Sequence, residues 1–391
     1  MLQDFMQIPF HRPDLPKDFN LIIPDSIRSG WLTTGNQVQK FEEELRTYLG
    51  CKHVVALNSC TAGLHLGLAA NRFGKGDKFI VPTFTFVSSV ECGEYLGMTP
   101  ILVDSEKGGF NLDLNQVEEW LKKDSSIKAI VPVHYGGNPV DTKTLYSLAK
   151  KYGVFILEDG AHALESTATA GKVGQTDYGV AFSFYANKNL TTFGEGGAFA
   201  TNNTSLAEKV KNLSLHGITK DGWRRFDSGG HWEYDIIDLG YKYNMPDVAG
   251  AFGRWQLKQI SDWQLKRKRI AEYYNKHLKN LTGIKCPNQS SLEGNSWHLY
   301  VIQINTDHWN ISRNEMIDYL TQKGIGLSVH YKPIHMLEYY HQKLGFKPEA
   351  FPRAHTLFES VISLPIYPNL TPIELDYIVA TIQNIALDHM K

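Results

Sequence analysis

The sequence predicts an α/β fold: a large domain with a mixed, mostly parallel sheet flanked by helices, followed by a smaller C-terminal α+β domain. Short apolar, β-branched runs alternate with segments of helical spacing between residues 36 and 216, which is typical of a sheet covered on both faces. The later part of the chain lacks this alternation, and 391 residues are enough for two domains. We therefore expect a large domain over residues 1–250, and a linking helix with the small domain over residues 251–391.

The large domain should contain six strands with continuous apolar character, at residues 53–57, 78–82, 99–104, 127–134, 154–159 and 180–186. The segments between them with the helical period are residues 61–73, 85–97, 111–123 and 142–153. Ligands of such sheets bind at the carboxyl ends of the strands, so functional side chains are expected there.

The second half of the chain begins with a segment rich in Gly, Asp, Trp and Arg at residues 217–247, which we interpret as a long functional loop because aromatic residues are frequent. A helical stretch follows from about Asp247 to near Gly283. The small domain should then contain a strand, a helix and a last helix, at residues 298–305, 313–324 and 372–387.

Composition excludes several classes of function. The 40 Lys+Arg and 41 Asp+Glu give a net charge of -1, which provides no global attraction for nucleic acid or an anionic membrane. The four cysteines (Cys51, Cys60, Cys92, Cys286) lie far apart without C-x-x-C spacing, so neither a disulfide framework nor a structural metal is expected. The sequence shows no secretory signal and no apolar run of about 18 residues, so a cytoplasmic protein is expected.

Three features at strand ends contain side chains that are suited to catalysis or ligand binding. Asp159 ends one apolar run, Lys188 follows the next strand before a Gly-rich turn, and residues 58–63 join the first strand to a helix, with hydroxyls at Ser59 and Thr61. Taken singly, each feature is explained by an ordinary helix cap or a surface lysine at least about as well as by a functional role. Together they match the needs of pyridoxal 5'-phosphate: a lysine for the Schiff base, a carboxylate for the pyridine nitrogen and a helix N-terminus for the phosphate.

Sequence blocks over nearly the whole chain support this interpretation. They include NSCTAGLHLGL (58–68), ILEDGAHALES (156–166), FSFYANKNLTTFGEGG (182–197), SWHLYVIQI (296–304) and GIGLSVHYKPIH (324–335). In order and content these blocks resemble the DegT/DnrJ/EryC1/StrS family of sugar-nucleotide aminotransferases. The resemblance implies the fold-type-I, aspartate aminotransferase-like architecture of pyridoxal-phosphate-dependent enzymes.

The resemblance also implies roles for single residues. Lys188 matches the lysine bound to the cofactor, Asp159 the partner of the pyridine nitrogen, and His162 the residue near the phenolic oxygen. These three would be catalytic. Phe86 occupies the position of the aromatic side chain that stacks on the pyridine ring.

The phosphate-binding positions of the family fall on Cys60, Thr61 and Ser183. Asn244 matches an asparagine that reaches the phosphate of the neighbouring subunit's cofactor. The last match implies a homodimer with shared active sites.

The reaction implied is amino transfer from L-glutamate to a nucleotide-linked keto-deoxysugar, which would yield an amino sugar for a surface polysaccharide, lipopolysaccharide or glycan. Phe193 lengthens the loop from Lys188 to Glu195 by one residue relative to the form common among enzymes that act at C4, and this length also occurs among C3-acting members. The blocks VPVHYGGNPVD, YKYNMPD and GIGLSVHYKPIH look more like C4 enzymes. We favour C4, with the nucleotide and the sugar left open.

Eight side chains are candidates for contact with the sugar nucleotide, although packing explains each of them equally well: Trp31, Thr33, His134, Tyr135, Arg224, Arg225, His330 and Tyr331. Two other functions stay open on this fold. A sugar dehydratase of the family would carry His at the position of Lys188, and a noncatalytic homologue should have lost Lys188 or Asp159. A nicotinamide oxidoreductase would need the G-x-G-x-x-G fingerprint, which the sequence lacks.

Overall fold

The protein is described by a computed structural model that covers residues 6–19, 22, 28, 30–218, 234–287, 294–389 and 391. Arg224, Arg225 and the central part of the expected loop lie outside the described residues. Within the part of the chain that is described, none of the helices combines the length and the apolar character needed to cross a bilayer.

The central element is a seven-stranded sheet with the order β1-β9-β8-β5-β4-β2-β3. Its five strands from β8 to β3 run parallel, whereas β9 is antiparallel to both of its neighbours. The strands are β1 (His53–Leu57), β2 (Lys78–Pro82), β3 (Thr99–Val103), β4 (Ile127–Ile130), β5 (Phe155–Asp159), β8 (Gly179–Ser183) and β9 (Gly197–Thr201). The α/β class with a mixed, mostly parallel sheet is thus confirmed, and β9 is a strand that the sequence did not predict.

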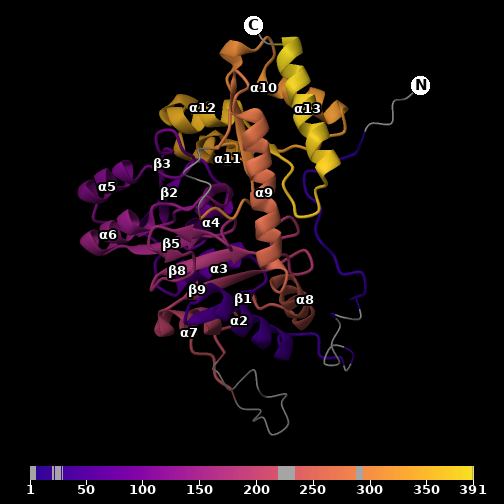
Figure 1. Cartoon of the computed structure of the whole chain (residues 1–391). Coiled ribbons are helices and arrows are strands. Elements are labelled where there is room, and N and C mark those ends of the chain that lie inside the picture. Colours follow the sequence, from indigo (N-terminus) through magenta and orange to yellow (C-terminus); the bar gives the residue numbers. More distant parts are fainter. Residues whose placement is uncertain are drawn as a thin grey trace.

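Helices cover both faces of this sheet (Figure 1). One face packs against α3 (Cys60–Ala69), α4 (Ser88–Glu94) and α7 (Thr204–Leu213). The other face packs against a second group, which consists of α2 (Asn36–Leu49), α5 (Leu114–Lys123), α6 (Thr142–Tyr152) and α8 (Asp247–Leu257). Alternate residues of β2 serve the two cores, with Phe79 and Val81 on the α3 side and Ile80 on the other. This burial on both faces explains why the strand sequences are continuously apolar.

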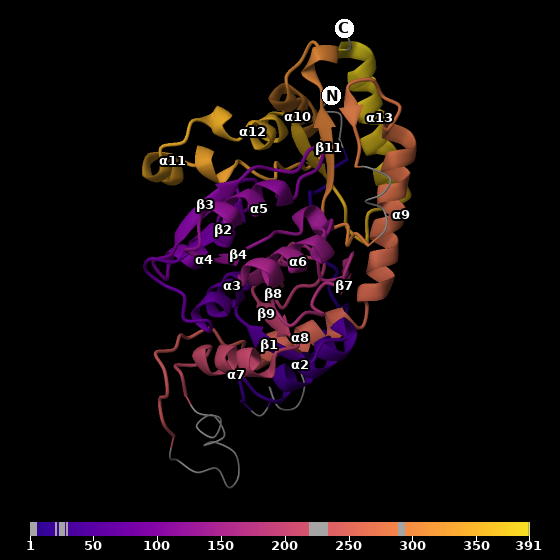
Figure 2. The same cartoon turned by 90° about the vertical axis from the view of Figure 1, so that its left-hand side faces the viewer.

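A second, antiparallel sheet of three strands lies in the C-terminal part, in the order β10 (Ile284–Lys285), β11 (Tyr300–Ile304) and β12 (Val361–Leu364). The helix expected from about Asp247 to Gly283 is two helices, because α8 ends at Leu257 and α9 (Ile260–Leu278) follows. Figure 2 shows α9 along the edge of the molecule, from the level of α8 to that of α13 (Pro372–His389).

The remaining elements are short or lie around the small sheet: β6 (Thr167–Ala168), β7 (Gly171–Lys172), α10 (Arg313–Gln322), α11 (Glu338–Leu344) and α12 (Pro352–Ser360). Buried side chains of α11 and α12, among them Tyr340 and Leu357, join the core on the α3 side of the large sheet. The N-terminal segment packs on the small sheet instead, since Ile8 pairs with Ile325 and lies in that core. The expected division at residue 250 stays a prediction.

Candidate active site

A cavity of about 480 Å³ lies at the carboxyl ends of β1, β5 and β8. Its wall contains nine of the residues to which the resemblance or the substrate prediction gives a role: Cys60, Thr61, Phe86, Asp159, His162, Ser183, Lys188, His330 and Tyr331. Ser59, Thr85, Ser88, Asn187 and Glu195 also line it. The topology therefore brings together side chains that are spread over most of the sequence.

Lys188 reaches this cavity from the loop after β8, where its backbone N–H donates to the carbonyl of Tyr185 at 2.9 Å. Desolvation by burial lowers the pKa of Lys188 to about 8, although the nearby Cys60 and Asp159 act in the opposite direction. A substantial fraction of the amine is therefore neutral at mildly alkaline pH. A neutral amine is the form that acts as a nucleophile or a base.

Asp159 ends β5 and is only 3% exposed. Its Oδ2 accepts a hydrogen bond from the Ser89 hydroxyl at 2.7 Å, and its Oδ1 accepts one from the backbone N–H of Ala161 at 3.0 Å. These donors hold a buried carboxylate in a fixed orientation at the cavity wall. Such a group suits a protonated ring nitrogen, because a buried anion is stabilised by a cationic partner.

The N-terminus of α3 forms another part of the wall. Ser59 is its N-cap, and the Ser59 hydroxyl accepts from the backbone N–H of Ala62 at 3.1 Å. Gly197 of β9 lies directly against this turn, since a Cβ built there would come within 2.3 Å of the Ser59 carbonyl carbon. The absence of a side chain thus lets the helix start close to the sheet edge, where its free N–H groups and dipole favour an anion.

His162 is fixed in one tautomer. The backbone N–H of Gly136 donates to its Nδ1 at 3.1 Å, and Nε2 lies 3.1 Å from the Tyr331 hydroxyl. Burial and the nearby Lys188 charge hold the pKa of His162 well below its usual value, so the ring is neutral. Its proton therefore sits on Nε2 and is donated to Tyr331.

Aromatic rings complete the cavity. Phe86 is 56% exposed and its ring centroid lies 5.8 Å from that of Tyr331. His330 forms a 2.8 Å hydrogen bond through Nδ1 with the Ser363 hydroxyl, and burial lowers the pKa of His330 to about 4. The exposed ring of Phe86 in the cavity wall is available to stack on a planar ligand.

Three predicted residues lie outside the cavity of their own chain. Asn244 donates from Nδ2 to the Thr34 hydroxyl at 2.7 Å, and the Trp31 indole N–H donates to the Thr34 carbonyl at 3.3 Å. Thr33 is exposed beside them. These residues form one cluster around Thr34, but they do not line the cavity that holds Lys188.

His134 and Tyr135 also lie elsewhere, and for His134 a direct substrate contact is not supported. The His134 ring is fully buried, its Nε2 lies 2.8 Å from a Glu158 carboxylate oxygen and its Nδ1 accepts from the backbone N–H of Val140. Both ring nitrogens are already engaged within the fold. Tyr135 donates its hydroxyl to the carbonyl of His330, so it supports the cavity wall from behind.

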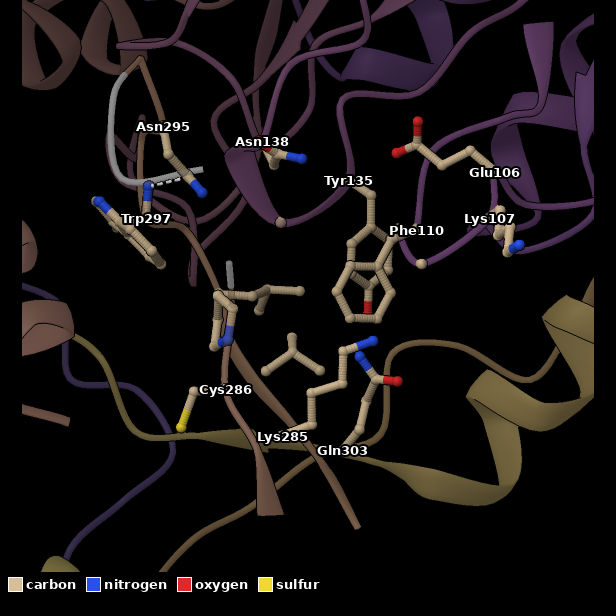
Figure 3. A pocket seen from close by; sticks show the side chains of 16 residues that line it. Glu106, Lys107, Phe110, Tyr135, Asn138, Lys285, Cys286, Asn295, Trp297 and Gln303 are labelled. Atoms are coloured by element: carbon tan, nitrogen blue, oxygen red, sulfur yellow. Dashed lines mark hydrogen bonds between the residues drawn. The ribbon is translucent and has the colours of Figure 1, made fainter. Parts of the chain in front are cut away.

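Tyr135 borders a second cavity of about 280 Å³ between the large and small sheets. Figure 3 shows Tyr135 and Phe110 facing Lys285 and Gln303 across it. Tyr135 and Phe110 stack with ring centroids 4.7 Å apart. None of the cofactor-binding residues implied by the resemblance lines this second cavity.

Sequence reasoning missed two residues that contact the site. Ser89 holds Asp159, but it lies in a helix far from Asp159 in the sequence and has no local signal. The imidazole Nε2 of His298 lies 3.5 Å from Lys188 Nζ. His298 belongs to the block SWHLYVIQI, whose sequence alone does not indicate a role for the histidine.

The donor set fits pyridoxal 5'-phosphate. An anion cradle at α3, a buried carboxylate at β5 and a largely desolvated lysine after β8 all face one cavity. Asn187 Oδ1, buried in the same wall, has no hydrogen-bond partner among the described residues and leaves an acceptor free for a ligand. The fold and the site thus define a pyridoxal-phosphate-dependent enzyme.

Comparison with known proteins agrees with this class. The model of the DegT/DnrJ/EryC1/StrS aminotransferase family matches residues 13–383, and the chain belongs to this family. The spore coat polysaccharide biosynthesis protein SpsC of Bacillus subtilis (strain 168) is 38% identical over 379 residues, which are 97% of each chain.

Two solved structures show the same architecture over nearly the whole chain. The sugar aminotransferase Spr1654 from Streptococcus pneumoniae, described as putative and solved in both PMP and PLP forms, matches with a TM-score of 0.89 and 32% identity. The PMP-form match covers 98% of this chain and 100% of that one. Helicobacter pylori PseC, an aminotransferase involved in the biosynthesis of pseudoaminic acid, matches with a TM-score of 0.87 and 28% identity, covering 98% and 100%. The protein is accordingly a pyridoxal-phosphate-dependent aminotransferase.

Proposed function

We propose that the protein transfers the amino group of L-glutamate to C4 of a nucleotide-linked keto-deoxysugar. The observation that carries this proposal is the single cavity in which Lys188, Asp159 and the N-terminus of α3 meet. The names of the relatives favour a sugar: Spr1654 is described as a putative sugar aminotransferase and SpsC as a polysaccharide biosynthesis protein. The product would be an amino sugar for a surface polysaccharide, lipopolysaccharide or glycan.

In this proposal the cofactor supplies an electron sink for the carbon that loses its proton. Lys188 is the nucleophile and the acid/base: its neutral Nζ takes the proton from Cα of the amino donor and returns one at the sugar carbon in the second half of the reaction. With the cofactor bound, Asp159 would hold the protonated pyridine nitrogen, His162 would face the phenolic oxygen, and Phe86 would stack on the ring. Support comes from the buried positions of Asp159 and His162 in the cavity wall.

The phosphate is assigned to the N-terminus of α3, with Cys60, Thr61 and Ser183 as its contacts. All three line the cavity, and the first two open the helix. Burial and the nearby Asp159 raise the pKa of the Cys60 thiol well above its usual value, so Cys60 stays neutral and adds no negative charge beside the phosphate.

We further propose a homodimer in which Asn244 completes the partner's site. Asn244 lies outside its own cavity, and large apolar side chains are exposed in the same protomer, among them Leu32 at 62%, Phe193 at 59% and Leu239 at 84%. Exposed large apolar side chains are common at subunit interfaces. Such a dimer would also be the means by which Trp31 and Thr33, near Asn244, reach a bound sugar nucleotide.

Subunit mixing tests this arrangement. Lys188→Ala and Asn244→Ala proteins should each be nearly inactive, but co-refolded mixtures should regain activity, because one site of a mixed dimer combines an intact Lys188 with an intact Asn244. Mixtures that stay inactive although sedimentation shows mixed dimers would contradict the shared site.

Among the other candidates for substrate contact, His330 and Tyr331 line the cavity and are assigned to the sugar. Arg224 and Arg225 stay candidates for the diphosphate, which suits the planar guanidinium. A double Arg224→Ala, Arg225→Ala variant should bind sugar nucleotide more weakly; unchanged apparent affinity would remove both arginines from the list.

The reaction itself is tested with a panel of UDP-, GDP- and dTDP-linked 3-keto and 4-keto sugars, read by glutamate consumption and product mass. The proposal predicts an amino sugar from a 4-keto substrate, and no product with Lys188→Ala protein. Turnover restricted to 3-keto sugars would move the reaction to C3, and elimination without amino transfer would favour a dehydratase. The cytoplasmic location stays a prediction.

A further inference from the structure

A histidine outside the residues assigned above faces the amine of Lys188. His298 lies just before β11 in the C-terminal part of the chain, is 6% exposed, and its Nε2 lies 3.5 Å from Lys188 Nζ. Its ring also packs against that of His162, with centroids 4.3 Å apart. The side chain therefore reaches from the small sheet to the reactive lysine of the large one.

The neighbours of His298 determine which of its nitrogens carries the proton. Asn189 donates from Nδ2 to the carbonyl of Ser296 at 2.9 Å, and a carbonyl can only accept, so the amide orientation is fixed. The other end of the amide, Oδ1, then faces His298 Nδ1 at 3.2 Å. Nδ1 must be the donor in this contact, which leaves the lone pair of Nε2 directed at Lys188.

The partly buried carboxyl group of Glu165 anchors this arrangement. Both oxygens of Glu165 accept from Asn189 Nδ2, at 3.3 and 3.2 Å. Burial raises the pKa of Glu165, and the positive charge of the buried Arg267 opposes this rise. Burial together with the positive charges nearby holds the pKa of His298 well below its usual value, so the ring stays neutral and keeps its acceptor.

We infer that His298 is a positioning residue for Lys188: its Nε2 accepts one N–H of the amine, in a tautomer set by Asn189 and Glu165. A free primary amine rotates about its Cε–Nζ bond. One hydrogen bond to a fixed acceptor removes much of that freedom, so that the amine lone pair is held toward the cavity where a proton is taken up. The inference rests on the role of Lys188 proposed above.

Two substitutions separate this role from simple packing. His298→Phe keeps an aromatic ring but removes the acceptor, whereas His298→Gln places an amide oxygen near the position of Nε2. The pKa of Lys188 is measured in the cofactor-free protein, from the pH dependence of its competitive acetylation read by mass spectrometry. The charged or titratable groups that act on the pKa of Lys188 are Cys60 and Asp159, and the lysine charge in turn acts on His11, His162 and His330. Neither variant changes any of these five residues.

An acceptor stabilises the ammonium form, so His298→Phe should lower the pKa of Lys188 by about one unit, and His298→Gln should leave it close to the wild-type value. With the cofactor bound, His298→Phe should lower kcat at least about tenfold with little change in KM for the amino donor, and His298→Gln should recover much of kcat. An unchanged pKa and pH profile in His298→Phe, with only a lower melting temperature, would show a packing role and overturn the inference.

Failure of the proposed function is recognised separately. Borohydride reduction of the cofactor-loaded wild-type protein should fix the cofactor on Lys188, whatever His298 does. If another lysine is labelled, the role of Lys188 is wrong; if Lys188 is labelled and His298→Phe behaves as wild type, the inference about His298 alone is wrong.

Discussion

Strand β5 ends in two neighbouring carboxylates, Glu158 and Asp159, which serve opposite faces of the central sheet. Glu158 accepts from His134 Nε2 at 2.8 Å and from the Tyr146 hydroxyl at 2.6 Å, and it is completely buried among helices. Asp159 accepts from Ser89 and from the backbone of Ala161, but its side chain borders the cavity that contains Lys188. The two carboxyl groups are one residue apart, but that of Glu158 has all its hydrogen-bond partners within the fold, whereas that of Asp159 is available to a ligand.

The difference shows that burial and hydrogen bonding do not by themselves mark a functional residue. On the Glu158 side, the hydrogen-bond donors are the His134 ring and the Tyr146 hydroxyl, which both belong to the protein. On the Asp159 side, the carboxyl group borders a cavity that has room for a cationic ligand. Because successive side chains of a strand point to opposite faces of the sheet, Glu158 has a structural role and its neighbour Asp159 is available for catalysis.

The largest effect is expected on the cavity side from Lys188→Ala. Loss of the nucleophile and base should lower kcat by about 10⁴-fold while the protein stays folded. Lys172→Ala, which removes another partly buried lysine with a hydrogen bond to the Tyr48 carbonyl, is the control and should retain activity. Steady-state kinetics on both variants checks this, and substantial turnover by Lys188→Ala protein would refute the mechanism.

The comparison itself is tested by the pair Asp159→Asn and Glu158→Gln. Asp159→Asn should lower kcat by about 10²-fold with little loss of stability, because the amide cannot hold a protonated ring nitrogen. Glu158→Gln should cost about 1–3 kcal/mol of unfolding free energy, because His134 and Tyr146 lose a charged acceptor, but the folded enzyme should stay active. Chemical denaturation and kinetics on both variants measure this, and equal losses of activity would contradict the division between the two faces.

The pH dependence of cofactor uptake is the next effect in size. Because desolvation lowers the pKa of Lys188 to about 8, its neutral fraction rises as the pH passes through that value and is nearly complete above it. The rate at which cofactor-free protein takes up pyridoxal phosphate should therefore rise about tenfold between pH 7 and pH 9 and then level off. Stopped-flow absorbance records this rate; a rise that continues to pH 10 or beyond would indicate an ordinary, solvated lysine.

The smallest expected effect concerns the helix caps. Ser59→Ala removes the N-cap of α3 at the proposed phosphate site, and Asn203→Ala removes the corresponding cap of α7, where the side chain accepts from Leu206. Each should cost about 1 kcal/mol of stability. Ser59→Ala alone should also weaken cofactor binding, by about fivefold, since it disturbs the turn whose N–H groups face the anion. Thermal melts and cofactor titrations distinguish them, and an equal loss of cofactor affinity in both variants would argue against a phosphate at α3.

Much of the large sheet was predictable because its strands are buried on both faces. β1 and β2 have the bounds that the apolar runs predicted, and β3 and β5 differ from theirs by a single residue. β9 was missed because its sequence, GAFAT, is short, rich in small residues and directly follows the Gly-rich turn. Local patterns find long apolar runs more readily than short strands whose position depends on their neighbours.

The candidate site was predictable where a residue lies at the end of a recognisable strand, as Asp159 does, or in a block with a known resemblance, as Lys188 does. Those residues meet in one cavity. The partners Ser89 and His298 were not predictable, because they approach from distant helices and from the small sheet. The place of His134 after a strand predicts a position at the sheet edge, but it does not predict that the ring turns away from the cavity to Glu158.

The central claim is that Lys188 is the lysine to which the cofactor attaches. Borohydride reduction of the cofactor-loaded protein, followed by digestion and peptide mass spectrometry, tests it directly. We predict that the added mass of the reduced pyridoxyl phosphate group appears on the peptide that contains Lys188 and on no other. The label on a different lysine, or no covalent label on protein that contains the cofactor, would contradict the account.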